Sequence, residues 1–338
     1  MPPLVSILTP CYNGAGYIDR LLSSVLAQDY PNVEMIVIDD GSTDNSRAII
    51  ERRIPEFENR GYALSCISQP NGGQSVAIDN GLKIIQGRYL AWPDMDDFYA
   101  DRSTLSRMVE VLERSDDTVS MVRGLPQFLN EHTLAVRSRQ RWRERKSGRT
   151  NLFEDCLYAC HGYWYPPVCY MAKVTAIDEC IPERKIYTDK NAGQNWQMML
   201  PLLYRHECIT LPTYLSNVLV RQASHSRGQY KTFEQIQDKL DAYENTIIAT
   251  LSGMSCLPED KRSHYQKSIR RKYLFERLDN CLYFGRHQEA REIIDRLKCE
   301  FRCNVVFAKI NYWCSYLPCY YRGRRLLSRV IRKLRSFI

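Results

Sequence analysis

The sequence lacks several features that would take it out of the ordinary soluble globular class. No run approaches the roughly 18 consecutive apolar residues that a membrane-spanning helix needs. The start, Met1-Pro2-Pro3-Leu4-Val5, has no basic leader followed by a long apolar segment. The thirteen cysteines are an odd number and include no Cys-x-x-Cys pair. We therefore expect a chain that stays in the cytoplasm with reduced thiols.

The closest cysteine spacings leave two interpretations open. Cys156 and Cys160 lie one helical turn apart, as do Cys299 and Cys303, and His161 follows the first pair directly. These residues could bind zinc, or the cysteines could simply be small buried hydrophobic residues. We favour packing.

Acidic residues are absent from residues 322–338, which carry seven Arg/Lys. The rest of the chain therefore sums to 8 − 7 = +1. In this tail the apolar residues fall on one helical stripe, a pattern typical of a helix lying on an anionic membrane surface. The alternatives are a helix packed on its own protein and a nucleic-acid arm. Interleaved aromatic residues are too few to favour nucleic acid, so we expect no nucleic-acid partner.

Apolar runs alternate with amphipathic segments through the first hundred residues. This alternation predicts a parallel sheet covered by helices on both faces, because parallel strands need crossover connections. Pro10 is expected to end the first strand, since proline donates no ladder hydrogen bond. The predicted strands are 5–9, 33–38, 62–68 and 89–92, and the predicted helices are 17–28, 45–57 and 73–86.

Polar clusters follow each predicted strand. They are Tyr12, Asp39-Asp40, Asn71-Gly72-Gly73 and Asp94-Met95-Asp96-Asp97. Because ligands of such sheets bind at the carboxyl ends of the strands, these clusters should face one crevice. Three carboxylates within four residues, 94–97, would repel one another unless a cation lay between them. The sequence therefore predicts a divalent metal site here, although Asp97 could instead cap the following turn.

An ordered set of short motifs in these hundred residues resembles the family 2 glycosyltransferases, which have the GT-A fold. The motifs are Thr9-Pro10-x-Tyr12-Asn13, Gln28-Asp29-Tyr30-Pro31, Ile38-Asp39-Asp40-Gly41-Ser42-Thr43-Asp44, Asn71-x-Gly73, Gly87-x-Tyr89 and Asp94-x-Asp96-Asp97. The resemblance implies a mixed, mostly parallel sheet and a site for a nucleotide-sugar donor. A UDP-sugar is the expected donor.

The resemblance also implies a role for each matching residue. Tyr12 corresponds to the position that packs on the base, and Thr9 and Asp39 to those that bond its polar edge. Asn71 belongs to the donor-binding set, and Asp94 lies at the position near the ribose. Asp96 corresponds to the ligand of Mg²⁺ or Mn²⁺, which neutralises the leaving diphosphate.

The chain departs from the family pattern at two places. Asp79 stands where an Asn is usual, so Asp79 is left out of the predicted site, although Asn80 could substitute. The acidic Glu-Asp pair of the family reads Gln194-Asn195, and an amide cannot take a proton at neutral pH.

Asp189, a few residues upstream, is our candidate catalytic base, with a loop cap as the alternative reading. Gln194, Asn195 and Trp196 are the predicted acceptor-binding residues. A further possibility is that catalysis here is weak or lost.

Two other stretches have open interpretations. The alternating run from Arg137 to Arg143 is either a solvated loop or edge strand, which we favour, or a phosphate-binding segment. The aromatic stretch 163–167 suits sugar rings and protein cores equally well.

We therefore expect a GT-A domain over 1–228, a helical extension over 229–321 and a basic tail helix over 322–338. The predicted function is inverting transfer of a sugar to a glycan or lipid-linked acceptor, at the inner face of a bacterial plasma membrane. The alternative is a nucleotide-sugar-binding scaffold protein without strong catalysis.

Overall fold

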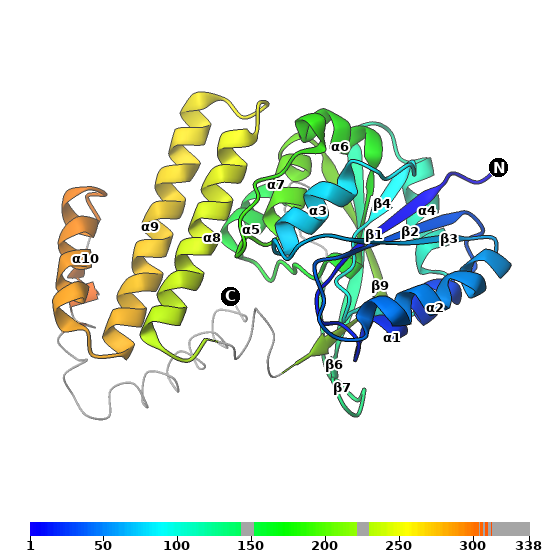
Figure 1. The fold of residues 1–338 in the computed structure, drawn as a ribbon. Helices are drawn as coiled ribbons and strands as arrows, with labels where there is room; N and C mark the ends of the chain where they lie inside the picture. The colour runs from blue at the N-terminus through cyan, green and yellow to red at the C-terminus, as the bar shows by residue number, and fades with distance from the viewer. Residues whose placement is uncertain (143–151, 222–229, 304, 307, 310–311, 313–338) are drawn as a thin grey trace. The chain divides into compact units, whose positions relative to one another are not determined.

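The computed structural model describes residues 1–142, 152–221 and 230–303, together with 305, 306, 308, 309 and 312 (Figure 1). Contacts divide the chain into two compact units. The first is Met1–Gln229 with Asn245–Arg262, and the second is Tyr230–Glu244 with Ser263–Ile338. The predicted tail helix over 322–338 lies outside the described residues. Within the described ranges, no helix combines the length and apolar character needed to cross a bilayer.

Strands and helices alternate through most of the first unit, as the sequence pattern predicts. In chain order they are β1 (Val5–Cys11), α1 (Ile18–Leu26), β2 (Val33–Asp39), α2 (Ser46–Asn59), β3 (Ala63–Ser68), α3 (Gln74–Leu82), β4 (Tyr89–Ala91), β5 (Phe98–Tyr99), α4 (Thr104–Arg114), β6 (Val119–Asn130), β7 (Val136–Arg139), α5 (Phe153–Tyr158), η1 (Pro167–Cys169), β8 (Tyr170–Lys173), α6 (Val174–Cys180), η2 (Pro182–Arg184), α7 (Asn195–Arg205) and β9 (Glu207–Val220).

These strands form one mixed sheet in the order β3-β2-β1-β4-β8-β6-β9-β5, with β7 paired to β6. Strands β3, β2, β1 and β4 are mutually parallel, whereas β8 is antiparallel to both β4 and β6. The chain steps from β1 to β3 through α1 and α2 and then returns to β4 through α3. Right-handed crossovers therefore place α3 on the face opposite α1 and α2, as Figure 1 shows. The predicted mixed sheet with helices on both faces is confirmed.

Close packing of helices on this sheet follows the predicted apolar spacing. Helix α1 buries Ile18, Leu21, Leu22 and Val25, which form one helical face. Helix α3 approaches β1 at Gly81, where an added Cβ would lie 2.2 Å from Leu8 Cδ1. A side chain at position 81 would therefore push α3 away from the sheet against which it packs.

The prediction that Pro10 ends the first strand is wrong, because β1 continues to Cys11. Residues of β1 face β2 and β4 alternately, and Cys11 faces β2, since its carbonyl accepts the Asp40 N–H at 2.8 Å. Pro10 thus faces the β4 side. Strand β4 has already ended there, at Ala91 opposite Ile7. Because no strand of the described residues lies beside Pro10 on that side, its lack of an N–H costs the sheet no hydrogen bond.

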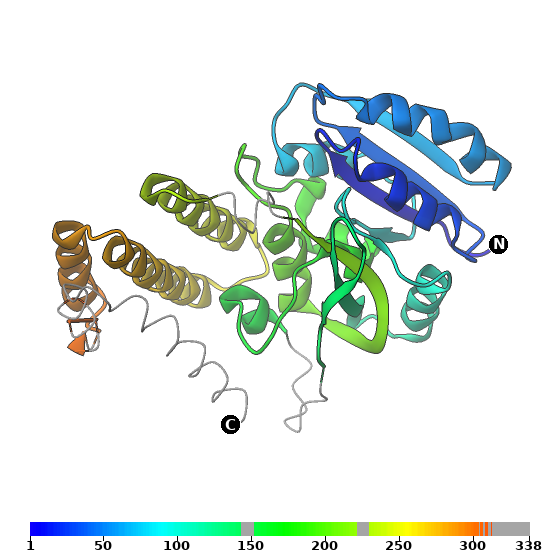
Figure 2. The same cartoon turned by 90° about the horizontal axis from the view of Figure 1, so that it is seen from below.

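The long pair β6 and β9 is only partly anticipated by the sequence. The pattern predicts a strand over 118–122, whereas β6 reaches Asn130, and neither β8 nor β9 is predicted. Strands β6 and β9 are parallel neighbours and lie side by side in both views (Figures 1 and 2). Their register shifts around Leu125 and Pro126. The shifts interrupt the regular hydrogen-bond pattern near Gly124 and Pro126, two residues that are disfavoured in a regular strand.

The second unit is helical in its described part, as predicted. The helices of the C-terminal part are α8 (Phe233–Gly253), α9 (Glu259–Tyr283) and α10 (His287–Cys299). A capping box precedes α8, since Gln235 N donates to Thr232 Oγ1 and Thr232 N donates to Gln235 Oε1, both at 3.2 Å. Ile293, Ile294 and Leu297 are buried in an apolar cluster shared by α9 and α10.

Candidate functional site

The predicted polar clusters meet at one edge of the sheet. Cys11 pairs with Asp39 at the ends of β1 and β2, so Tyr12 and Asp39 lie at the same edge. The loop after β3 joins them, because Gln69 N donates to the Asp39 carbonyl at 2.9 Å. Asp94 follows β4, the other neighbour of β1. The convergence expected from strand order is therefore present in the fold.

Asp39 and Asp40 both hold the loops around this edge. Asp39 accepts hydrogen bonds from Ser42 N at 3.1 Å and Ser68 Oγ at 3.2 Å. Asp40 accepts the N–H groups of Gly72 and Gly73, each at 2.8 Å. The Asn71 side chain donates to the Asp40 carbonyl at 3.0 Å, so its amide nitrogen is used within the loop. Asn71 is thus placed at the site chiefly as part of this scaffold.

Tyr12 and Thr9 differ in their accessibility at the same strand end. Tyr12 is 46% exposed, which leaves a ring free to stack on a flat ligand. Thr9 is fully buried, and its hydroxyl has no hydrogen-bond partner among the described residues. The donor-binding roles of Thr9, Tyr12, Asp39, Asn71 and Asp94 stay predictions, but all five residues belong to the clusters at this edge.

Asp94, Asp96 and Asp97 bring their carboxylate oxygens together, with one oxygen from each lying within 4.8 Å of the others. Asp94 Oδ1 accepts two amide hydrogen bonds, from Gln74 Nε2 and Gln194 Nε2, each at 2.7 Å. Asp97 is buried and accepts the Leu219 N–H at 3.1 Å.

Arg221 directly follows β9 and provides a counter-charge to this cluster. Its Nε lies 2.8 Å from Asp96 Oδ2, an ion pair without the alignment of a hydrogen bond. Its guanidinium also lies over the Tyr17 ring, 4.7 Å from the ring centre. Neither Gln74 nor Arg221 could be assigned to this cluster from the sequence pattern, since each comes from a distant part of the chain.

The electrostatics of the cluster favour a bound cation. Burial, followed by the charge of Asp96, raises the pKa of Asp94 to about 7. The same two causes raise the pKa of Asp97 well above its usual value. Three carboxylates whose negative charges repel one another are suitable oxygen ligands for a hard divalent cation such as Mg²⁺ or Mn²⁺. The residues present therefore suit the predicted metal, with Asp96 and its neighbours as ligands.

The loop that carries Asp189 lies against the start of α3. Ser75 Oγ donates to the Asp189 carbonyl at 2.9 Å and accepts the Asp189 N–H at 3.1 Å. Gly73 has a φ of +94°, and an added Cβ would lie 2.5 Å from the Lys190 carbonyl oxygen, so only glycine fits there. The Asp189 side chain is exposed, and its Oδ1 accepts the Asn191 N–H at 2.9 Å. Asp189 therefore caps its own loop beside the predicted donor site.

The predicted acceptor residues begin α7 but are not equally accessible. Gln194 is fully buried and turned to Asp94, while its Oε1 has no partner among the described residues. Asn195 is half-buried, and its Oδ1 likewise has no partner there. Trp196 Nε1 donates to the Cys156 carbonyl at 3.3 Å, and its ring packs edge-on against Tyr165. Asn195 and Trp196 are thus less buried than Gln194, and the acceptor-binding role of all three residues stays a prediction.

The two stretches with open interpretations are also resolved in part. Residues 136–139 form the exposed edge strand β7, where Arg139 Nε donates to Gln127 Oε1 at 2.8 Å. Within the aromatic stretch, Trp164 is buried, and the Arg123 guanidinium lies 3.7 Å from the centre of its ring. Tyr163 and Tyr165 are half-buried and pack against each other. The stretch therefore combines a core residue with partly exposed rings.

Comparison with known proteins identifies the family of part of this chain. Residues 6–165 match the family described as "Glycosyl transferase family 2". This segment is a glycosyltransferase family 2 domain. The matched range begins in β1 and includes the carboxylate cluster, so the resemblance in the motifs is confirmed. The family's fold, GT-A, is also that of the mixed sheet described above.

Several curated relatives carry the same domain. A putative teichuronic acid biosynthesis glycosyltransferase, TuaG of Bacillus subtilis, is 37% identical over 113 residues, which are 33% of this chain and 44% of TuaG. An uncharacterised glycosyltransferase of Rickettsia conorii is 34% identical over 134 residues, 40% of this chain and 21% of that protein. The chain thus spans less than half the length of these relatives.

Solved structures resemble a larger part of the chain. TarS 1-349 of S. aureus, in complex with UDP-GlcNAc, has a TM-score of 0.61 at 16% identity, covering 94% of this chain and 92% of that one. A mannosyltransferase from Pyrobaculum calidifontis, in complex with GDP-Man and Mn²⁺, has a TM-score of 0.55 at 15% identity, covering 97% and 84%. At these identities the likeness concerns the fold.

Both departures from the family 2 pattern have a structural reason in this chain. Asp79 is buried, accepts the Ile186 N–H at 2.9 Å and pairs with Lys83, so its carboxylate anchors the segment after η2. Gln194 donates to Asp94, which an acid at this position could do only while protonated. The Asp79 carboxylate is therefore occupied by contacts within the fold, and the Gln194 amide is a suitable hydrogen-bond donor to the neighbouring Asp94 carboxylate.

Replacing Gln194 by Glu should destabilise the protein. The substitution would place a buried carboxyl group about 2.7 Å from the half-buried Asp94 carboxylate, as Nε2 now is from Asp94 Oδ1. One of them must then keep a proton at neutral pH or remain an uncompensated charge, at a cost of about 3 kcal/mol. We expect a lower melting temperature and a lower urea midpoint at pH 7.

The matched control is Asn195→Asp, which makes the same chemical change at the next residue. Asn195 is half-buried at the first position of α7, where a negative charge interacts favourably with the helix dipole. This variant should melt within a degree or two of wild type, by the small size of that effect. Equal losses of stability in both variants would contradict the matching of Gln194 to Asp94.

Proposed function

We propose that this protein transfers a sugar, with inversion, from a nucleotide-diphosphate donor to a glycan or lipid-linked acceptor in bacterial surface polysaccharide synthesis. The carboxylate cluster carries the proposal, because three acids at the end of β4 within 4.8 Å suit a metal that bridges a diphosphate. The family of residues 6–165 supports this proposal, as does the similarity to TuaG, a putative teichuronic acid biosynthesis glycosyltransferase.

In this proposal the donor occupies the edge formed by β1, β2 and β4. The exposed Tyr12 ring stacks on the base, and Asp39 and Thr9 bond its polar edge. Asp94 is positioned for the ribose by the two amides that hold its Oδ1. Mg²⁺ or Mn²⁺, when bound at Asp96, supplies positive charge to the leaving diphosphate. UDP is the proposed nucleotide, supported by the UDP-GlcNAc complex of the structurally similar TarS.

The acceptor half of the proposal rests on the loop 187–194 and on α7. Asp189 is the proposed base, because its carboxylate is exposed and its backbone is held by Ser75 beside the start of α3. The rings of Trp196 and Tyr165 offer faces on which a sugar can stack. Asn195 directly precedes Trp196, and its amide oxygen, which is buried, has no hydrogen-bond partner among the described residues.

A second candidate function is a nucleotide-sugar-binding scaffold protein of a polysaccharide assembly complex. The observation that favours it is the amide pair at 194 and 195, since neither residue can remove a proton from an acceptor. Transfer or donor hydrolysis by the purified protein would exclude this alternative, whereas binding without turnover would support it.

A panel of nucleotide sugars tests the donor half directly. UDP-, GDP- and TDP-sugars are added with Mn²⁺ or with chelator, and the melting temperature is recorded. A ligand that binds only the folded state stabilises it by about 2.7 kcal/mol at a hundred times its Kd. We expect a UDP-sugar to raise the melting temperature, and only when Mn²⁺ is present. If no nucleotide sugar changes it under either condition, the proposed donor site is wrong.

We further propose that residues 322–338 bind the anionic inner face of the plasma membrane, so that the enzyme is cytoplasmic and peripheral. The support is the sequence pattern, seven basic residues without an acid opposite an apolar stripe. Deleting 322–338 should move the protein from anionic liposomes into solution, most clearly at low salt. An unchanged partition would count against this role.

A further inference from the structure

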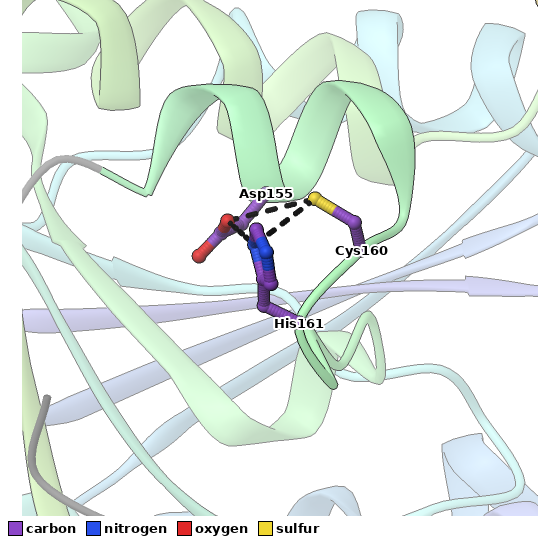
Figure 3. Close-up of side chains that lie close together, drawn as sticks. All are labelled: Asp155, Cys160 and His161. Atoms are coloured by element: carbon purple, nitrogen blue, oxygen red, sulfur yellow. Dashed lines mark hydrogen bonds and ion pairs between the residues drawn. The ribbon is translucent and has the colours of Figure 1, made fainter. Parts of the chain in front are cut away.

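A second group of metal-ligating side chains lies at the end of α5, and its residues are not those of the proposed donor site. Asp155, Cys160 and His161 (the 155–161 cluster) bring one ligand atom each to within 4.8 Å of one another. Figure 3 shows the thiol and the imidazole turned toward the carboxylate. From the sequence, the candidate zinc ligands are Cys156, Cys160 and His161. In the structure Asp155, and not Cys156, lies beside Cys160 and His161.

The backbone explains this exchange of partners. Helix α5 ends at Tyr158, and Ala159 and His161 both have left-handed φ values, +52° and +51°. Cys160 therefore lies beyond the helix, and the chain turns back over Asp155 instead of continuing the spacing from Cys156. Cys156 is fully buried, and burial keeps its pKa far above the usual value, so this thiol is an apolar core residue as expected.

The distances within the 155–161 cluster match those of a tetrahedral metal site. Cys160 Sγ lies 3.3 Å from His161 Nδ1 and 3.6 Å from Asp155 Oδ1. Zinc bonds of about 2.0–2.3 Å at tetrahedral angles separate neighbouring ligand atoms by about 3.3–3.8 Å. His161 Nδ1 and Asp155 Oδ1 are closer, at 2.8 Å, because they share a hydrogen bond. When a metal ion replaces the proton of this hydrogen bond, the two atoms can separate by about half an ångström.

The ligand types also discriminate between metals. One thiolate, one imidazole and one carboxylate form a borderline-soft set that favours zinc over Mg²⁺ or Mn²⁺, which prefer oxygen alone. Asp155 is buried, Cys160 is half-buried and His161 is exposed. A cation would stabilise the charge of the buried carboxylate, and the exposed His161 side lets water reach the fourth position.

We propose that Asp155, Cys160 and His161 bind one zinc-class divalent cation, with water as the fourth ligand. The ion would fasten the end of α5 to the loop that follows it. The same helix carries the Cys156 carbonyl, which accepts hydrogen bonds from Trp196 Nε1 and from the Tyr165 hydroxyl. Binding therefore stabilises the support of these two rings, whether or not the chain is a transferase.

Cobalt substitution tests the site without reference to activity. The full-length, untagged protein is stripped with chelator and titrated with Co²⁺, which develops a thiolate-to-metal absorption band only when a cysteine is a ligand. We expect one equivalent of Co²⁺ to produce the band and one equivalent of Zn²⁺ to abolish it. Cys160→Ser should lose the band, and His161→Gln should weaken Zn²⁺ binding about tenfold or more.

Two control variants separate this site from others in the chain. Cys299→Ser removes an exposed thiol on α10, and Asp96→Asn alters the carboxylate cluster, and both should keep the band. Zn²⁺ should raise the melting temperature of wild type and of both controls, but not that of Cys160→Ser. Absence of the band in wild type, or its persistence in Cys160→Ser, would overturn the proposal. An equal Zn²⁺-induced shift in wild type and Cys160→Ser would overturn it as well.

Discussion

Replacing Asp96 by Asn is expected to abolish Mn²⁺-dependent donor binding and to lower sugar transfer roughly a thousandfold. Asp96 is central to the carboxylate cluster, and its charge helps to raise the pKa of both Asp94 and Asp97. A metal that stabilises a leaving diphosphate contributes several kcal/mol, and each 1.36 kcal/mol is about tenfold in rate. The measurements are Mn²⁺ titration by calorimetry and turnover of the UDP-sugar selected by thermal stabilisation.

Arg221 complicates the interpretation of this variant, because Asp96→Asn also removes its partner. The companion variant Arg221→Gln keeps the carboxylate and removes the competing charge. Without nucleotide it should bind Mn²⁺ at least as tightly as wild type, since a cation no longer lies 2.8 Å from Asp96 Oδ2. If Arg221→Gln and Asp96→Asn lose metal affinity equally, the ion pair matters for folding and Asp96 is not shown to be a ligand.

The matched control for Asp96 is Asp241→Asn in the helical unit. Asp241 also pairs with an arginine, Arg277, which retains Glu244 as a second partner at 2.6 Å. Exposed pairs of this kind contribute at most about 1 kcal/mol, so Mn²⁺ affinity and turnover should match wild type. An Mn²⁺ affinity of Asp96→Asn equal to that of this control would remove the metal assignment.

The donor edge could be predicted from sequence because its signals are local. Three acids within four residues directly follow the apolar run 89–92, and strand order alone brings them to Tyr12 and Asp39. The contacts that tune the acids are not local. Gln194 reaches Asp94 across a hundred residues, and Arg221 reaches Asp96 from the end of β9, so nothing in either stretch indicates the pairing.

Missed strands and misplaced clusters have equally particular causes. Strand β9 contains Pro212 and β6 contains Gly124 and Pro126, residues that argue against a strand unless the register shifts, which only the partner strand determines. At α5 the one-turn spacing of Cys156 and Cys160 suggests a shared helical face. The left-handed Ala159 ends the helix first, and that conformation is rare for a non-glycine residue.

Replacing Asp189 by Asn should lower transfer by about 10²–10⁴-fold while leaving donor binding unchanged, the usual contribution of a general base. The asparagine Oδ1 can still accept the Asn191 N–H, as the carboxylate does at 2.9 Å, and the two Ser75 hydrogen bonds involve only the backbone of residue 189. The loop should therefore keep its shape, and the amide removes only the ability to take a proton. Turnover at saturating donor, with the melting temperature in UDP-sugar and Mn²⁺ as the binding control, measures the effect.

Asn195→Asp makes the Asp189 experiment decisive, because it restores an acid where the family pattern has one. In the wild-type background it should alter turnover little if Asp189 already serves as base. Combined with Asp189→Asn it should recover part of the lost rate, since Asn195 is half-buried at the start of α7 and its side-chain oxygen has no hydrogen-bond partner among the described residues. Wild-type transfer by Asp189→Asn alone would show that the base lies elsewhere. If Asn195→Asp instead creates turnover that wild type lacks, the chain is the nucleotide-sugar-binding scaffold, and its missing acid is the reason.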